Sequence, residues 1–518
     1  MKKGLHIGAM GIIIIAYCAW IISRICQMPI NADAACMILE AEDILAGNLF
    51  LKDWSLTGIT FLTTDLPYYI IGTAIAGVSL NAYRIAVSLM FLVMLGCAVL
   101  LCLYGSKRKW FSFAIFAGMG LFPTFYALSN TFVHTAVFSF FFLTVLLVLR
   151  TEENPSRRNF TVLGILVALA VCGDGLALVL ITLPLLALCL FRVVKKPVLL
   201  AVCTIGGTVA GLLLQKLYLL FGADMNSLLH SEFIAPAQLV DNVLLYIEYV
   251  LRLLNAYFFE KEVFSLKTAF YAVKILLFLL TCGVMYRSIR NACKKEATDL
   301  PSLFTGIGFG LMTLILWLTT FSVNITTGRY IAFLPLLMGI LLAKWAEGFP
   351  LFQKPLPIAA AVLLSFCLAA TNALPKDREP VPENVLSRMA TFLEEEGLTS
   401  GYAAFWDSTS ITVYSEGHVN VRAVMYSGQA LRPREWFCKK SWYDEEANFV
   451  LIKNEDSVKE EDTYRYNGIF NSGIDSGYRY EVTRENVEKF LGSPTKTKEF
   501  ENYTILIYDT IQLEKSWL

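Results

Sequence analysis

The chain has 518 residues, of which 56% are hydrophobic and 17% are charged, and its mean hydropathy is +0.57. This composition is far more apolar than that of a soluble domain, so much of the surface is expected to face lipid. The net charge is zero, and no clustered basic face is visible, which argues against nucleic acid as a partner. The lipid bilayer is the first expected partner.

Apolar runs suited to crossing a membrane recur along the first 373 residues. A span needs about 20 mostly apolar residues to cross about 30 Å of hydrocarbon. Eleven segments qualify, at about residues 5–25, 82–104, 110–128, 131–149, 159–173, 175–192, 198–221, 267–287, 301–321, 330–346 and 356–373. The sequence therefore predicts a polytopic α-helical membrane protein with about 11 transmembrane helices.

The loops between these segments differ in charge. Lysines and arginines gather in alternate loops, around residues 2–3, 107–109, 157–158, 192–196, 287–295 and 344–354. Because cytoplasmic loops accumulate positive charge, the N-terminus is predicted to be cytoplasmic. An odd number of spans then places the C-terminal region outside the cytoplasm. The predicted location is the cell membrane, with the chain crossing it many times.

Two long outer loops are predicted, at residues 26–81 and 222–266. The first contains an amphipathic helical pattern from Asp33 to about Ala46, which is typical of a helix lying at the membrane surface. A second apolar stretch, from Leu66 to Leu80, is short and glycine-rich, which predicts an interfacial or re-entrant helix.

The composition becomes charged and polar after Leu374, so residues 374–518 are predicted to form a separate extracytoplasmic domain. The predicted helices are 383–396, 408–415 and 484–491, and the predicted strands are 401–406, 419–425, 448–453 and 503–508. This alternation favours a small α/β sandwich. Four aromatic residues of this region either stack on sugar rings or form its core: Trp406, Trp436, Trp442 and Tyr443.

Three carboxylates of the first outer loop are candidates for chemistry. Asp33 stands at the start of the amphipathic helix, and Glu40 and Asp65 are candidates for a second acid. A carboxylate at the membrane surface can deprotonate an acceptor hydroxyl, or can bind a cation that in turn binds a phosphate. The alternatives are that Asp33 caps the helix, that Glu40 is only solvated and that Asp65 belongs to a turn. Asp174, in a C-G-D-G sequence, is interpreted as a turn carboxylate.

Several short motifs resemble the GT-C membrane glycosyltransferases of the protein O-mannosyltransferase and aminoarabinose-transferase type. They are N-A-D-A-A-C-M-I-L-E-A-E-D-I-L-A-G-N (31–48), D-L-P-Y-Y (65–69), N-A-Y-R-I (81–85), S-N-T-F-V-H (129–134) and G-R-Y-I-A-F-L-P-L-L (328–337). The resemblance covers residues 1–373 and places the family's catalytic aspartate at Asp33. The glutamate that usually follows it is Ala34 here.

The resemblance implies a GT-C-like fold and a polyprenyl-phosphate sugar donor. The sugar would pass with inversion to a glycan, lipid or protein acceptor of the cell envelope, at the extracytoplasmic face. A divalent cation is the one cofactor that such a site suggests, and Ala34 leaves both the cation and its ligands undetermined.

Cationic and polar residues near the outer ends of the predicted helices are candidates for binding the donor phosphate. Arg329, beside Tyr330, is preferred because a guanidinium group matches phosphate oxygens. Its alternative role is that of an interfacial anchor. Arg252 and Lys261, in the second outer loop, are weaker candidates. His134 is a further candidate for contact with sugar or phosphate, and the alternative is a packing histidine.

Two other classes of function stay open. A transporter or flippase of a lipid-linked or small solute would place ionisable groups near the bilayer midplane and would often show related halves. A non-catalytic cell-envelope scaffold would need no reactive site. The acidic outer loop and the globular C-terminal region favour an enzyme, a glycosyltransferase working at the outer surface.

Overall fold

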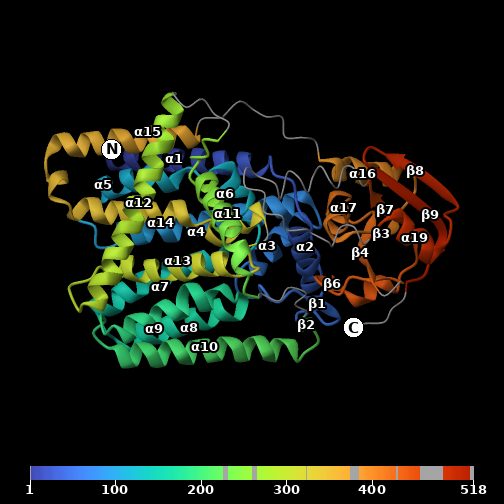
Figure 1. Ribbon diagram of the computed structural model, residues 1–518, viewed down its shortest axis with the longest axis horizontal. Coiled ribbons are helices and arrows are strands. Elements are labelled where there is room, and N and C mark those ends of the chain that lie inside the picture. Colours follow the sequence, from blue (N-terminus) through green and yellow to red (C-terminus); the bar gives the residue numbers. More distant parts are fainter. Residues whose placement is uncertain are drawn as a thin grey trace.

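The computed structural model describes residues 2–225, 232–259, 265–322, 324–373, 384–427, 430–454 and 482–513. A bundle of long helices forms one part, and a sheet-containing region from the C-terminal part of the chain lies beyond one end of the bundle (Figure 1). Two shorter helices, α2 (Ala32–Leu45) and α3 (Leu66–Ala76), lie between the two parts.

The other helices of the bundle coincide with the predicted apolar segments, except the helix Leu239–Leu253, which lies within the predicted outer loop 222–266. They are α1 (Lys2–Ile25), α4 (Leu80–Leu103), α5 (Lys109–Phe116), α6 (Phe125–Ser129), α7 (Ala136–Glu153), α8 (Arg157–Gly173), α9 (Leu183–Leu190), α10 (Pro197–Leu219), α11 (Leu239–Leu253), α12 (Leu266–Cys293), α13 (Leu300–Leu318), α14 (Leu334–Gly348) and α15 (Pro355–Ala373). Each predicted span has a helix at its place.

Six helices are long and apolar enough to cross a membrane among the residues that the structure describes. They are Leu80–Leu103, Pro197–Leu219, Leu266–Cys293, Leu300–Leu318, Ile325–Gly348 and Pro355–Ala373. Shorter apolar helices lie at Ile13–Ile25, Leu66–Ala76, Lys109–Leu121 and Leu178–Leu190. The helical, multi-pass class is compatible with this arrangement, and the number of eleven spans stays a prediction.

The segment predicted as one span over residues 110–128 is broken. Helix α5 passes into a π-helical turn (Ala117–Leu121), the backbone becomes extended at Phe122, and α6 begins after Thr124. Pro123 explains the break, because proline has no N–H to continue the helical hydrogen bonds. The chain then forms a loop, residues 130–135, before α7 starts.

Helix α2 begins where the sequence predicts it, but it is not an exposed surface helix. Asn31 caps it, since the Oδ1 atom of Asn31 accepts the N–H of Ala34 at 2.9 Å. Every residue from Ala32 to Ala41 is buried. The C-terminal region encloses α2 by adding Phe405, Val413 and Phe437 to the same apolar cluster, and the position of α2 at the membrane interface stays a prediction.

The C-terminal region contains a six-stranded sheet with the order β5-β4-β3-β7-β9-β8. The strands are β3 (Ser400–Ala403), β4 (Asn420–Ser427), β5 (Ala430–Pro433), β7 (Ala447–Lys453), β8 (Lys496–Phe500) and β9 (Tyr503–Ile511). Strand β3 is parallel to both β4 and β7, and the outer pairs are antiparallel. The order places the strands that the sequence predicts at the centre of the sheet, and β5 and β8, which it missed, at the edges.

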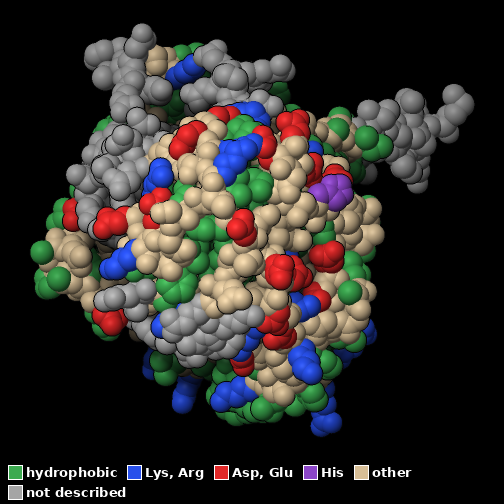
Figure 2. Space-filling view, turned by 90° about the vertical axis from the view of Figure 1, so that its right-hand side faces the viewer, with side chains coloured by type: hydrophobic (Ala, Val, Ile, Leu, Met, Phe, Trp, Pro, Cys, Tyr) green, Lys and Arg blue, Asp and Glu red, His purple; other side chains and the backbone are tan. Residues whose placement is uncertain are grey.

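Apolar clusters lie on both faces of this sheet. On one face, α16 (Val385–Glu395) and α17 (Thr409–Tyr414) contribute Met389 and Ile411. On the other, α19 (Arg484–Leu491) contributes Val487. The predicted α/β sandwich is confirmed. Its surface turned away from the bundle carries acidic and basic side chains among polar ones, as expected of a face in water (Figure 2).

The C-terminal region and the first outer loop share a small sheet. Strand β1 (Trp54–Leu56) pairs antiparallel with β6 (Cys438–Lys439) and parallel with β2 (Asp224–Met225). The ammonium group of Lys439 lies 2.9 Å from the carboxylate of Asp43, which also accepts the indole N–H of Trp54 at 2.8 Å. These contacts fix the C-terminal region over α2.

Candidate functional site

Asp33 lies in the first turn of α2 and is only 7% exposed. Its Oδ2 atom is 3.8 Å from Nη1 of Arg329. Its other oxygen, Oδ1, is buried and has no hydrogen-bond partner among the described residues. Burial raises the pKa of Asp33 above its ordinary value, and the positive charges of Arg329, His134 and Arg434 partly oppose this rise. The carboxyl group thus has one oxygen beside a cation and one oxygen left for a ligand.

Arg329 lies on a 3₁₀ segment, η4 (Ile325–Ile331), directly before α14. One of its terminal nitrogens, Nη2, donates to the hydroxyl of Tyr330 at 3.1 Å, and the guanidinium carbon lies 5.9 Å from the ring centre of Phe132. Its Nε atom is buried and has no hydrogen-bond partner in the part of the chain that the structure describes. Unsatisfied buried N–H groups are costly, so this nitrogen is suited to receive a ligand oxygen.

The segment that holds Arg329 is fixed by hydrogen bonds to two helices. The hydroxyl of Tyr249, on α11, donates to the carbonyl of Asn324 at 2.8 Å, and the hydroxyl of Tyr126, on α6, donates to the carbonyl of Ile325. A Cβ atom on Gly328 would collide with the hydroxyl of Tyr126, so any larger residue there requires Tyr126 or η4 to shift. Arg329 is therefore positioned by the packing of its neighbours.

Asp65 precedes α3 and is fully buried. Its Oδ1 atom accepts the backbone N–H groups of Thr135 and Ala136 at 2.9 and 3.3 Å, at the start of α7, while Oδ2 has no partner. Burial and the nearby Asp174 raise the pKa of Asp65 to about 6, against the favourable effects of His134 and the two backbone N–H groups. This carboxyl group ties two segments together and keeps one oxygen unused.

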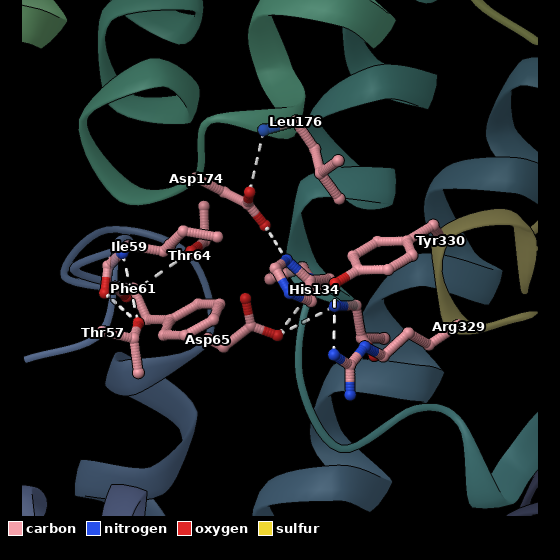
Figure 3. Close-up of polar contacts among 12 residues, drawn as sticks. Thr57, Ile59, Phe61, Thr64, Asp65, His134, Asp174, Leu176, Arg329 and Tyr330 are labelled. Carbon is pink, nitrogen blue, oxygen red and sulfur yellow. Dashed lines mark hydrogen bonds and ion pairs between the residues drawn. The ribbon is translucent and has the colours of Figure 1, made fainter. Parts of the chain in front are cut away.

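His134 and Asp174 form a buried pair. The Nδ1 atom of His134 lies 2.8 Å from Oδ2 of Asp174, whose Oδ1 accepts the N–H of Leu176 at 2.9 Å. The imidazole ring also contacts the rings of Phe61 and Tyr330, with centroid distances of 5.1 and 5.0 Å. Figure 3 shows Asp65, His134, Tyr330 and Arg329 converging on one region.

The remaining candidates lie in other contacts. Glu40, two turns after Asp33, is 1% exposed, and burial raises its pKa well above the ordinary value; its Oε2 atom has no partner. Arg252 is paired with Glu248 on α11 at 2.7 Å. Lys261 lies outside the described residues. The structure thus brings together Asp33, Arg329, Tyr330, His134 and Asp65.

Two residues of interest, Arg434 and Lys274, were not identified from the sequence, and a third, Asp174, was interpreted only as a turn carboxylate. Asp174 does accept a turn N–H, as expected, but it also pairs with His134. Arg434 stacks on Phe405 and Trp436 and acts electrostatically on Asp33 from the C-terminal region, a contact that no local pattern predicts. Lys274 is fully buried in α12, and the rule that ionisable residues inside spans are functional candidates would have found it.

The aromatic residues of the C-terminal region serve mainly in packing. Tyr443 is buried, and Trp406, Trp436 and Trp442 are half-buried against the cores. Trp442 also packs edge-on against Trp54, with ring centroids 4.9 Å apart. The alternative that these residues form the core is the one that the structure favours.

Among the described residues, no group of three or more His, Cys, Asp or Glu side chains is placed to hold a metal ion. A divalent cation bound by Asp33 would need a second acidic ligand beside it, but the neighbour of Asp33 is the cation Arg329. The residues present therefore do not form a ligand set for a metal ion around Asp33. No protein-family model matches the chain, and a search of curated proteins found no match.

Proposed function

We propose that the protein is a membrane glycosyltransferase that transfers a sugar from a polyprenyl-phosphate donor to an acceptor hydroxyl at the extracytoplasmic face. The observation that supports this most is the pairing of Asp33 with Arg329. A buried carboxyl group with an unused oxygen lies beside a guanidinium group with an unused N–H, at the junction of the bundle and the C-terminal region. A base and an anion-binding group are the two elements that this transfer requires.

In the proposed reaction, Asp33 accepts the proton of the acceptor hydroxyl as the acceptor oxygen attacks the anomeric carbon. The bond between that carbon and the phosphate oxygen breaks, and the electron pair leaves with the polyprenyl phosphate. Arg329 stabilises the negative charge that grows on the phosphate. Attack from the side opposite to the leaving phosphate inverts the anomeric configuration. No metal ion is assigned a step.

The distance within the pair has a consequence for the order of events. A base lies about 3 Å from the hydroxyl it deprotonates, and the hydroxyl oxygen about 3 Å from the carbon it attacks. The phosphate must lie on the far side of that carbon, whereas Asp33 and Arg329 are 3.8 Å apart. We therefore infer that the donor phosphate draws Arg329 away from Asp33, and that the ion pair belongs to the resting enzyme.

The membrane arrangement supports the proposal in a general way. The site lies at the end of the bundle that carries the C-terminal region (Figure 1), and that region presents a charged face suited to water (Figure 2). The positively charged loops of the sequence connect the opposite helix ends. With the cytoplasm on that side, donor and acceptor would meet outside the cytoplasm, in the cell envelope.

One observation favours a transporter as the second candidate. Lys274 is fully buried within an apolar helix, where its Nζ atom donates to Oδ1 of Asn372 at 2.8 Å. Buried ionisable groups in spans often mark solute or ion pathways.

An assay in proteoliposomes separates the two candidates. Purified protein is given a panel of radiolabelled polyprenyl-phosphate sugars with envelope acceptors, and movement of the donors across the bilayer is followed in parallel. The proposal predicts labelled acceptor and free polyprenyl phosphate. Donor translocation without any transfer would contradict it and favour the transporter.

A further inference from the structure

We propose that His134 and Asp174 form a second anion-binding element, in which Asp174 positions His134 so that its Nε2 atom binds the phosphate oxygens of the lipid donor. This inference rests on the proposed function, because it names how the same site recognises its donor. Asp174 is a positioning residue that acts only through the imidazole, and Arg329 supplies the other contact to the phosphate.

The orientation of the imidazole follows from its contacts. The Oδ2 atom of Asp174 lies 2.8 Å from Nδ1 of His134, and Oδ1 accepts the N–H of Leu176. The carboxylate therefore holds the proton on Nδ1 of the imidazole. For Nε2, no hydrogen-bond partner is found in the part of the chain that the structure describes. The ring is held between Phe61 and Tyr330, which prevents it from turning away. Nε2 is thus the ring atom available to a ligand.

Tyr330 connects this pair to the arginine. Its ring contacts the imidazole, with centroids 5.0 Å apart, and its hydroxyl accepts Nη2 of Arg329 at 3.1 Å (Figure 3). The two basic groups therefore lie on either side of one tyrosine. A phosphate group has several oxygens, so a single phosphate can bind Arg329 and His134 at the same time.

The backbone around His134 is strained, and this observation is independent of the contact between His134 and Asp174. His134 has a φ of 60° and Phe61, whose ring touches it, has a φ of 51°. This left-handed conformation costs free energy for residues other than glycine, and residues in such conformations are frequent at functional sites. Asp65 holds the strained turn in place by accepting the next two N–H groups, from Thr135 and Ala136.

Charge explains why a second cation is needed. The charged or titratable groups that face His134 come from four segments: Asp33 on α2, Asp65 before α3, Asp174 after α8, and Tyr330 with Arg329 on η4. Three carboxyl groups and one arginine would repel a phosphate. With Nδ1–H directed at Asp174, Nε2 must also carry a proton to donate to a phosphate oxygen, so the imidazole that binds the donor holds protons on both nitrogens.

The test measures binding of farnesyl phosphate, a short polyprenyl monophosphate, to the full-length protein in detergent by calorimetry. Asp174→Asn and His134→Gln are each expected to weaken binding about tenfold to hundredfold, the usual worth of a charged hydrogen bond. The double variant is expected to bind no more weakly than His134→Gln, since Asp174 acts through the imidazole.

Asp299→Asn is the matched control, because Asp299 caps α13 by accepting the N–H of Ser302 at 3.0 Å and lies outside the site. It should bind farnesyl phosphate like the wild type. The inference would be overturned if Asp174→Asn bound farnesyl phosphate as tightly as the wild type. It would also be overturned if the losses of binding free energy in the two single variants added up in the double variant. Because no sugar is transferred in this assay, a failure of the proposed function appears separately, as absence of transfer with every donor.

Discussion

The buried carboxyl group of Asp65 should make the stability of the protein depend on pH. Its pKa is raised from the ordinary 3.8 to about 6, chiefly by burial. For a carboxyl group whose pKa is higher in the folded than in the unfolded chain, the stabilisation is complete below the ordinary value and is lost as the pH rises through the folded value. The difference corresponds to about 3 kcal/mol, lost between roughly pH 4 and pH 7.

The perturbation is Asp65→Asn, which removes the titration but keeps an oxygen for the N–H of Thr135. Unfolding free energies are measured in mixed micelles by titration with SDS, at several pH values between 4 and 7.5. The wild type should lose about 3 kcal/mol relative to the variant over this range. Asp299→Asn serves as the control and should titrate like the wild type. Equal pH dependence in the wild type and Asp65→Asn would refute the reasoning.

Three further predictions concern the same region. Arg329→Gln should raise the KM for the donor at least about tenfold, as measured from initial rates over a range of donor concentrations. Arg252→Gln should change this KM little, because Arg252 is already paired with Glu248 within α11. Glu40→Gln should leave transfer rates and their pH profile within about twofold of wild type, since burial raises the pKa of that carboxyl group and so disfavours its charged form. A tenfold loss would instead give Glu40 a catalytic role. Gly328→Ala should lower kcat and raise KM together, because its methyl group displaces the hydroxyl of Tyr126 and moves η4; unchanged kinetics would show that η4 tolerates the shift.

The sequence predicts those parts of the molecule that local chemistry determines. Apolar length locates the long helices, and the pattern after Asn31 predicts α2 with Asp33 in its first turn. In the C-terminal region, strands β4, β7 and β9 are predicted because they are rich in Val, Ile and Thr, and β3 because it belongs to a short apolar and aromatic run. Strands β5, β6 and β8 were missed, since they are short or polar and form by pairing with distant partners.

The arrangement of the site depends on contacts that no local pattern contains. Asp174 becomes part of the site only because the turn after α8 meets the loop before α7. Arg434 reaches the surroundings of Asp33 from a strand region 401 positions later in the chain. The burial of α2 likewise depends on the C-terminal region packed against it, which the amphipathic pattern of residues 33–46 does not predict.

The most direct test of the central claim compares sugar transfer by the wild type and by Asp33→Asn in proteoliposomes, at equal amounts of folded protein. Asparagine keeps the shape of the side chain but cannot accept a proton at neutral pH. The account predicts transfer by the wild type and a loss of about 10²- to 10⁴-fold in the variant, the usual contribution of a general base. Transfer that survives unchanged in Asp33→Asn would contradict the assignment of Asp33 as the base.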